Sequence, residues 1–107
     1  MSAYLNMFGD PCSFDTKVRP GDGGTFLFGN DTASAPFVSA LILVLRVDPE
    51  GEPVSLFSKN DPNAPGEVRI CTLQPGEVFA VPLERLVYVR ATADFDSRVA
   101  CKIVSTR

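Results

Sequence analysis

The stretch FVSALILVLRV, residues 37–47, followed at once by the turn sequence DPEG at 48–51, decides the fold of this chain. Periodicity alone cannot assign it, because its apolar residues would occupy both faces of a strand or all sides of a helix. Its four β-branched residues favour a strand, and Pro49 and Gly51 are typical turn residues. The run therefore predicts a central strand hydrogen-bonded on both edges, with a buried helix as the alternative.

The rest of the chain divides into short segments between closely spaced turn residues, mainly Gly, Pro, Asn and Asp. Several of these segments alternate with period two. In residues 99–103, Val99, Cys101 and Ile103 share one face and Lys102 takes the other, which is typical of a half-buried strand. The only other helical candidate is a single turn at 82–86. Further strands are expected at 24–28, 53–58, 67–73, 77–81 and 86–91, with a weaker one at 13–18.

These seven or eight short antiparallel strands predict an all-β fold, a single β-sandwich or small barrel. The chain has no Trp, which argues against an immunoglobulin domain and favours a jelly-roll-like or other Greek-key sandwich. Its 107 residues suit one domain. We expect residues 1–12 to form an N-terminal arm and residues 13–107 to form the sandwich domain.

Charge and hydropathy exclude two classes of partner. The formal net charge is −3, and the Lys and Arg residues are scattered singly rather than clustered as phosphate binding requires, so we expect no nucleic acid. The longest apolar run is far shorter than the roughly 20 residues of a membrane-spanning helix. The first residues lack the positive flank and apolar core of a signal peptide. We expect a soluble protein without an export signal.

The sequence contains no recognisable catalytic apparatus. It has no His, the most common general base and neutral metal ligand, so a metal-dependent cupin enzyme is disfavoured. Carboxylate pairs could be proposed at Asp94 with Asp96 and at Glu67 with Glu77. The first pair fits a hairpin tip and the second fits solvated strand edges. The oxygen-rich turns lack EF-hand spacing. We expect no catalytic residue, no cofactor and no metal.

Three cysteines, Cys12, Cys71 and Cys101, form an odd set without a CxxC pair. This count favours free thiols in a reducing compartment. A bridge between Cys71 and Cys101 on neighbouring strands is the alternative.

The N-terminal arm carries four large apolar side chains, Tyr4, Leu5, Met7 and Phe8. Chain ends are usually polar and frayed, so an apolar end needs a surface on which to dock. One possibility is the protein's own core. The other is a neighbouring subunit, which makes these four residues the candidate interface.

The last third of the chain resembles the ending of many small virion proteins of tailed phages. The resemblance covers LQPGEVFAVPL at 73–83, LVYVRATA at 86–93 and RVACKIV at 98–104. In those proteins a Pro-Gly turn leads into a strand that ends at a Pro-containing corner, and a YVRA-like strand then pairs with a final strand.

The resemblance implies a capsid decoration or cement protein, a compact sandwich on the outer surface of the virion. Such a protein is assembled in the host cytoplasm, is often a homo-oligomer and frequently a trimer, and stabilises the head shell by binding the major capsid protein or another virion protein. The alternative is a carbohydrate- or ligand-binding β-sandwich module. Sugar sites usually present Trp and Tyr platforms, and this chain offers only Tyr4 and Tyr88.

Overall fold

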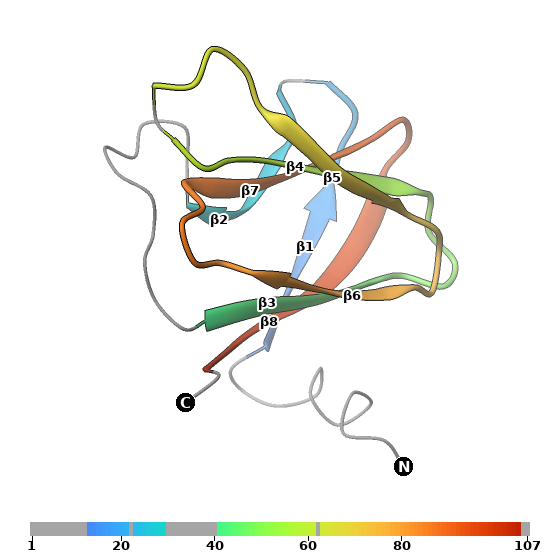
Figure 1. Cartoon of the computed structure of the whole chain (residues 1–107). Coiled ribbons are helices and arrows are strands. Elements are labelled where there is room, and N and C mark those ends of the chain that lie inside the picture. The colour runs from blue at the N-terminus through green and yellow to red at the C-terminus, as the bar shows by residue number, and fades with distance from the viewer. Residues whose placement is uncertain (1–12, 22, 30–40, 62, 106–107) are drawn as a thin grey trace.

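The computed structural model describes residues 13–21, 23–29, 41–61 and 63–105 (Figure 1). The described part of the chain contains eight strands and no helix, so nothing in it could cross a membrane as a helix. The strands are β1 (Ser13–Val18), β2 (Thr25–Gly29), β3 (Leu41–Val47), β4 (Val54–Lys59), β5 (Val68–Leu73), β6 (Val78–Pro82), β7 (Tyr88–Ala93) and β8 (Ser97–Ser105).

The strands form two four-stranded sheets, with order β1-β8-β3-β6 in sheet A and β2-β7-β4-β5 in sheet B. All pairs are antiparallel. In Figure 1 the layer with β4 and β5 lies above the layer with β3 and β6. Four of the pairs are nested, namely β1 with β8, β2 with β7, β3 with β6, and β4 with β5. This is the strand order of a jelly roll, so the predicted all-β sandwich is confirmed.

The core lies between the two sheets and is built by alternation along the strands. In β3, Leu43, Leu45 and Val47 point inward and are fully buried, and in β4 Val54 and Leu56 do the same. Sheet positions with this spacing share one face because successive side chains alternate. The two inner faces therefore form one apolar cluster, and the residues between these positions form the outer faces.

The described part of the apolar run at 37–47 forms a strand. β3 covers residues 41–47 and lies between β8 and β6, which confirms the central position; residues 37–40 lie outside the described part. The helical candidate at 82–86 does not form a helical turn. There the chain makes a tight turn, in which the Leu86 amide donates to the Leu83 carbonyl at 3.1 Å and Arg85 has a φ of 65°. A positive φ at Arg85 cannot occur within a right-handed helix.

The pairing of the last two strands that the resemblance implied is not found either. β7 pairs with β2 and β4 in sheet B, whereas β8 pairs with β1 and β3 in sheet A. Residues 94–96 are therefore a connection between the sheets and not a hairpin tip. Asp96 forms an exposed ion pair with Lys17 at 3.1 Å.

Cys71 and Cys101 are free thiols. Cys71 lies on β5 in sheet B, and Cys101 lies on β8 in sheet A, where it belongs to the core. The two strands are not neighbours, so the alternative of a bridge between adjacent strands does not apply. Cys12 lies outside the described residues.

Candidate interface

Part of the outer face of sheet A is apolar. Since Leu43 and Leu45 of β3 point into the core, Ile42 and Val44 point outward. The same alternation turns the even-numbered residues of β6 and β8 outward. We call the resulting set the apolar strip; it consists of Ile42, Val44, Val78, Ala80, Pro82 and Val104.

Register aligns the apolar strip across three adjacent strands. Ile42 of β3 is paired with Val104 on β8 and with Pro82 on β6. One step along β3, Val44 is paired with Ala80. Val44 is buried at the centre of the face, whereas Ala80 and Pro82 are exposed. Val78, farther along β6, keeps 41% of its surface exposed. The strip therefore runs from an exposed edge strand to the middle of the sheet.

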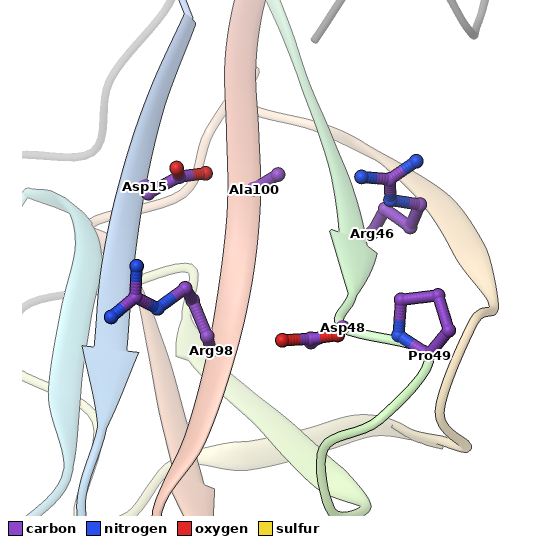
Figure 2. A pocket seen from close by; sticks show the side chains of 6 residues that line it. All are labelled: Asp15, Arg46, Asp48, Pro49, Arg98 and Ala100. Atoms are coloured by element: carbon purple, nitrogen blue, oxygen red, sulfur yellow. The ribbon is translucent and has the colours of Figure 1, made fainter.

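A charged hollow borders the apolar strip on the same face. It has a cavity volume of about 160 Å³ and is lined by Asp15, Arg46, Asp48, Pro49, Arg98 and Ala100. Figure 2 shows that three strands and one turn supply these side chains: β1, β8, β3 and the segment that follows β3. The Asp48 carboxylate points from the end of β3 toward β8. The hollow is smaller than the roughly 300 Å³ at which small-molecule sites begin, so it suits a single side chain better than a cofactor.

The turn after β3 that carries Asp48 and Pro49 is fixed by a dense set of hydrogen bonds. The Asp48 amide donates to the Arg98 carbonyl at 2.9 Å, and the Asp48 carboxylate accepts from the Glu50 amide at 3.0 Å. The buried hydroxyl of Ser97 accepts from the Glu52 amide at 3.0 Å and donates to the Glu52 carbonyl at 2.9 Å. This wall of the hollow is therefore held in place by β8.

The outer face of sheet B has a different character. Cross-strand register places Phe26 beside Arg90, Arg90 beside Phe57, and Phe57 beside Arg69, so aromatic and guanidinium groups alternate over all four strands. The Arg90 guanidinium carbon lies 4.9 Å from the centre of the Phe57 ring, within cation–π range. The Phe26 ring meets the buried Tyr88 ring edge-on at 5.2 Å. Side chains on this face therefore contact one another, and Phe26 remains exposed.

A small polar network completes the outer face of sheet B. Glu67 accepts hydrogen bonds from the Tyr88 hydroxyl at 2.5 Å, from Arg90 Nε at 3.2 Å and from Arg90 Nη2. Arg90 Nη1 donates to the Gly23 carbonyl. The hydrogen bonds from Arg90 hold the pKa of Glu67 below its usual value, with the Tyr88 hydroxyl as a smaller cause. Both charged groups find partners within the protein, as expected for a structural network.

The structure does not bring the sequence-predicted candidates into one site. Tyr4, Leu5, Met7 and Phe8 lie outside the described residues. The proposed acid pair Glu67 and Glu77 is split: Glu67 bonds to Arg90 and Tyr88, whereas the Glu77 carboxylate accepts from the Gln74 amide at 2.7 Å. Within the described ranges, His, Cys, Asp and Glu side chains form no cluster that could hold a metal ion.

Sequence reasoning missed the outer face of sheet A, although the signal was present. A strand with apolar residues on both faces is expected in a sheet covered on both sides. A two-layer sandwich covers each sheet on one side only, so such a strand must present apolar residues outward. The segments LILVLRV at 41–47 and VFAVP at 78–82 both have this property.

No protein-family model, curated protein or solved structure matches this chain.

Proposed function

We propose that this protein is a non-enzymatic structural protein that acts through protein–protein contacts, and that it decorates and stabilises the head shell of a tailed phage. The observation that carries the proposal is the apolar strip on the outer face of sheet A. Contiguous apolar patches on the surface of a folded domain often mark protein–protein interaction sites. The resemblance of residues 73–104 to small virion proteins supplies the virion setting.

The composition of the face supports a protein partner. Protein–protein interfaces combine an apolar centre with a polar, charged rim. Here Val44 lies on the interior strand β3, and Asp15, Asp48 and Arg98 line the charged hollow that borders the strip. Full burial of one apolar side chain is worth about 1.5–3 kcal/mol, so burial of the exposed part of the strip supplies enough free energy for a reversible contact after association costs are subtracted.

The alternative function, carbohydrate binding, has less support from the described residues. Sugar platforms need exposed aromatic rings. Tyr88 is only 3% exposed, and its hydroxyl is engaged by Glu67. The exposed aromatic residues Phe14, Phe26 and Phe95 offer no polar group to orient a sugar.

The proposal is tested in the particle. Virions of a phage that encodes this chain are purified and their proteins are counted by mass spectrometry; we expect a fixed number of copies per particle. Heads lacking the gene product are then mixed with purified protein, and bound protein is measured by co-sedimentation. Heads with the bound protein should resist heat or chelator better than bare heads.

A matched pair of variants makes the test specific to the surface. Val78→Asp places a charge at the edge of the apolar strip, whereas Val68→Asp makes the same change on the exposed edge strand of sheet B, where Val68 is 68% exposed. Val78→Asp should lower head binding at least about tenfold, since about 1.4 kcal/mol corresponds to that factor, and Val68→Asp should bind normally. Absence of the chain from virions, or normal binding by both variants, would refute the proposal.

A further inference from the structure

We infer that the edge strand β6 pairs with β6 of a second copy of this chain, antiparallel and about a two-fold axis at Phe79, so that the two four-stranded sheets join into one continuous sheet. The contact uses the main-chain edge of β6 and leaves the outer face of sheet A open, so it does not rest on the proposed function. A two-fold contact uses the same surface on both copies, so this edge must be complementary to itself.

The main chain of β6 has one bonded side and one open side. The Val47 amide donates to the Glu77 carbonyl at 3.1 Å across the boundary between β3 and β6. Because the N–H and C=O groups of successive strand residues point to opposite sides, the odd-numbered residues bond to β3, and the main-chain groups of Val78, Ala80 and Pro82 point away from it. No described strand lies on that side. Within the described residues, no hydrogen bond from another segment reaches Val78 or Ala80 there.

Among the four edge strands of the described sheets, β6 is the least protected against such pairing. Natural edge strands are blunted by charged side chains and by β-bulges. β1 contains Asp15 and Lys17, and β5 contains Arg69 and an irregular register with β4. The register of β2 with β7 shifts between Phe26 and Phe28. The sequence of β6, VFAVP, has no charge, and its register with β3 is regular.

β6 carries one protective residue, Pro82, whose position selects the register. Proline has no N–H to donate, so a residue paired with Pro82 keeps an unsatisfied carbonyl. An axis at Phe79 sets Val78 opposite Ala80 of the second copy, twice, and sets Pro82 opposite Gly76, outside the second strand. Each pair exchanges two hydrogen bonds, so all outward groups of Val78 and Ala80 find partners. An axis at Ala80 would set Val78 opposite Pro82 and leave both Val78 carbonyls without donors.

The side chains agree with this register. On the inner face the two Phe79 rings become cross-strand partners at the axis, and aromatic pairs at such positions stabilise sheets. Phe79 is half-buried against the core, so the pairing covers its remaining exposed surface. The Glu77 carboxylate bonds within its own turn and comes opposite Val81 rather than a like charge. On the outer face Val78 meets Ala80 of the second copy, so the apolar strip continues from one copy into the other.

A proline on the open edge tests the contact in the full chain. Ala80→Pro removes the outward N–H of residue 80 in each copy, and with it half of the intermolecular hydrogen bonds, while the bonds from β6 to β3 remain. Proline is tolerated at such edge positions. Native mass and sedimentation are measured across ~1–100 µM, because contacts of this small size are weak and reversible. We expect a dimer for the unaltered protein and association weakened at least about tenfold for Ala80→Pro. Lys17→Pro, the same change on the edge strand β1, should dimerise normally.

Engineered cysteines test the register. Directly opposite residues of a hydrogen-bonded pair have Cα atoms about 5.5 Å apart, within the about 4.4–6.8 Å that a disulfide spans, whereas diagonal neighbours lie about 7–8 Å apart. The Val78→Cys and Ala80→Cys proteins are mixed and oxidised, and the bridges are located by peptide mass mapping. The unaltered protein controls for the natural cysteines. We expect bridges between positions 78 and 80 to form faster than bridges between two copies of either position.

The outcomes separate this contact from the proposed function. A monomer at every concentration, a trimer, undiminished association of Ala80→Pro, or bridges that join like positions as fast as unlike ones would each overturn the inference. If melting shows that Ala80→Pro is unfolded, the cysteine pair decides alone. A monomeric Ala80→Pro protein that still binds heads would leave the proposed function standing, and a dimer that is absent from virions would leave only the edge contact.

Discussion

Glu67 and Arg90 form a two-point ion pair that bridges strands which are not neighbours. Glu67 immediately precedes β5, Arg90 lies on β7, and β4 separates these strands in sheet B. Arg90 passes over the Phe57 ring of β4 to reach the carboxylate. The two side chains are only 22% and 17% exposed, so solvent screens this pair less than an ordinary surface salt bridge.

Replacing Glu67 with Gln should therefore destabilise the fold. The substitution keeps the shape of the side chain but removes the charge to which Arg90 and Tyr88 donate. Hydrogen bonds to charged groups contribute about 1.5–3 kcal/mol, and we expect a loss near the lower end because the pair is partly exposed. Urea unfolding measures it. Asp96→Asn, which breaks the exposed pair with Lys17, should change stability by less than about 0.5 kcal/mol; equal losses would show that the network adds nothing.

The same pair predicts acid sensitivity. The pKa of Glu67 is lowered in the folded protein from its usual value of 4.5, so folding favours the ionised carboxylate. That contribution is complete above pH 4.5 and is lost as the pH falls through the folded-state pKa. Melting curves of the natural protein and of Glu67→Gln should differ at pH 7 and converge well below pH 4.5. A constant difference at every pH would show that ionisation of Glu67 is not the cause.

Removing the Ser97 hydroxyl should loosen the wall of the charged hollow. Ser97→Ala deletes both hydrogen bonds to the backbone of Glu52 and leaves those groups without their partner. We expect a loss of about 1–3 kcal/mol in unfolding free energy and faster amide hydrogen exchange in the turn at 48–51. Ser55→Ala, which removes one bond to Thr72 on the outer face of sheet B, is the control. Unchanged exchange at 48–51 in Ser97→Ala would contradict the role given to Ser97.

The thiols should differ in reactivity. Burial raises the pKa of Cys101 to about 12, and it raises the pKa of the half-buried Cys71 to a smaller extent. Thiolates are the reactive species, so Cys101 should be inert to a thiol reagent at pH 8 until the protein unfolds, whereas Cys71 reacts slowly. In denaturant without reductant all three cysteines, Cys12 included, should titrate as free thiols. A single reactive group would reveal a disulfide.

Deleting residues 1–8 should affect assembly more than folding. The deletion removes Tyr4, Leu5, Met7 and Phe8 and keeps all residues of the eight described strands. We expect altered native mass or weaker head binding, with a melting temperature close to that of the full chain. Normal assembly together with a lower melting temperature would assign these residues to the protein's own core.

The elements of the fold were largely predictable from the sequence, and their pairing was not. The strand predicted at 13–18 matches β1, and the run at 37–47 becomes the central β3 over its described part, because turn residues and β-branched runs are local signals. The helical candidate at 82–86 fails at Arg85, whose positive φ could not be predicted from the local sequence. The resemblance to small virion proteins implied that β7 pairs with β8. β7 and β8 lie in different sheets because they pair with β2 and β1, and local sequence patterns do not predict such distant pairings.

The candidate site was less predictable for a related reason. The sequence does not show whether Ile42 and Val78 are covered, because this depends on the number of layers in the fold. Once the sandwich has only two layers, the same residues become an exposed strip. Arg98 and Asp48 likewise meet only through register, since they are 50 positions apart in the chain.

The nested strand order has a consequence for how the chain folds during synthesis. Phe14 is paired with Cys101, and β7 and β8 occupy interior positions in their respective sheets. Neither sheet can form completely until these last two strands are available. Among the described strands, only β4 and β5 are both consecutive in the chain and paired with each other. Folds dominated by such distant pairings form slowly, in milliseconds to seconds. β7 and β8 must therefore leave the ribosome before the sandwich can assemble, and until then the apolar strands synthesised earlier stay exposed.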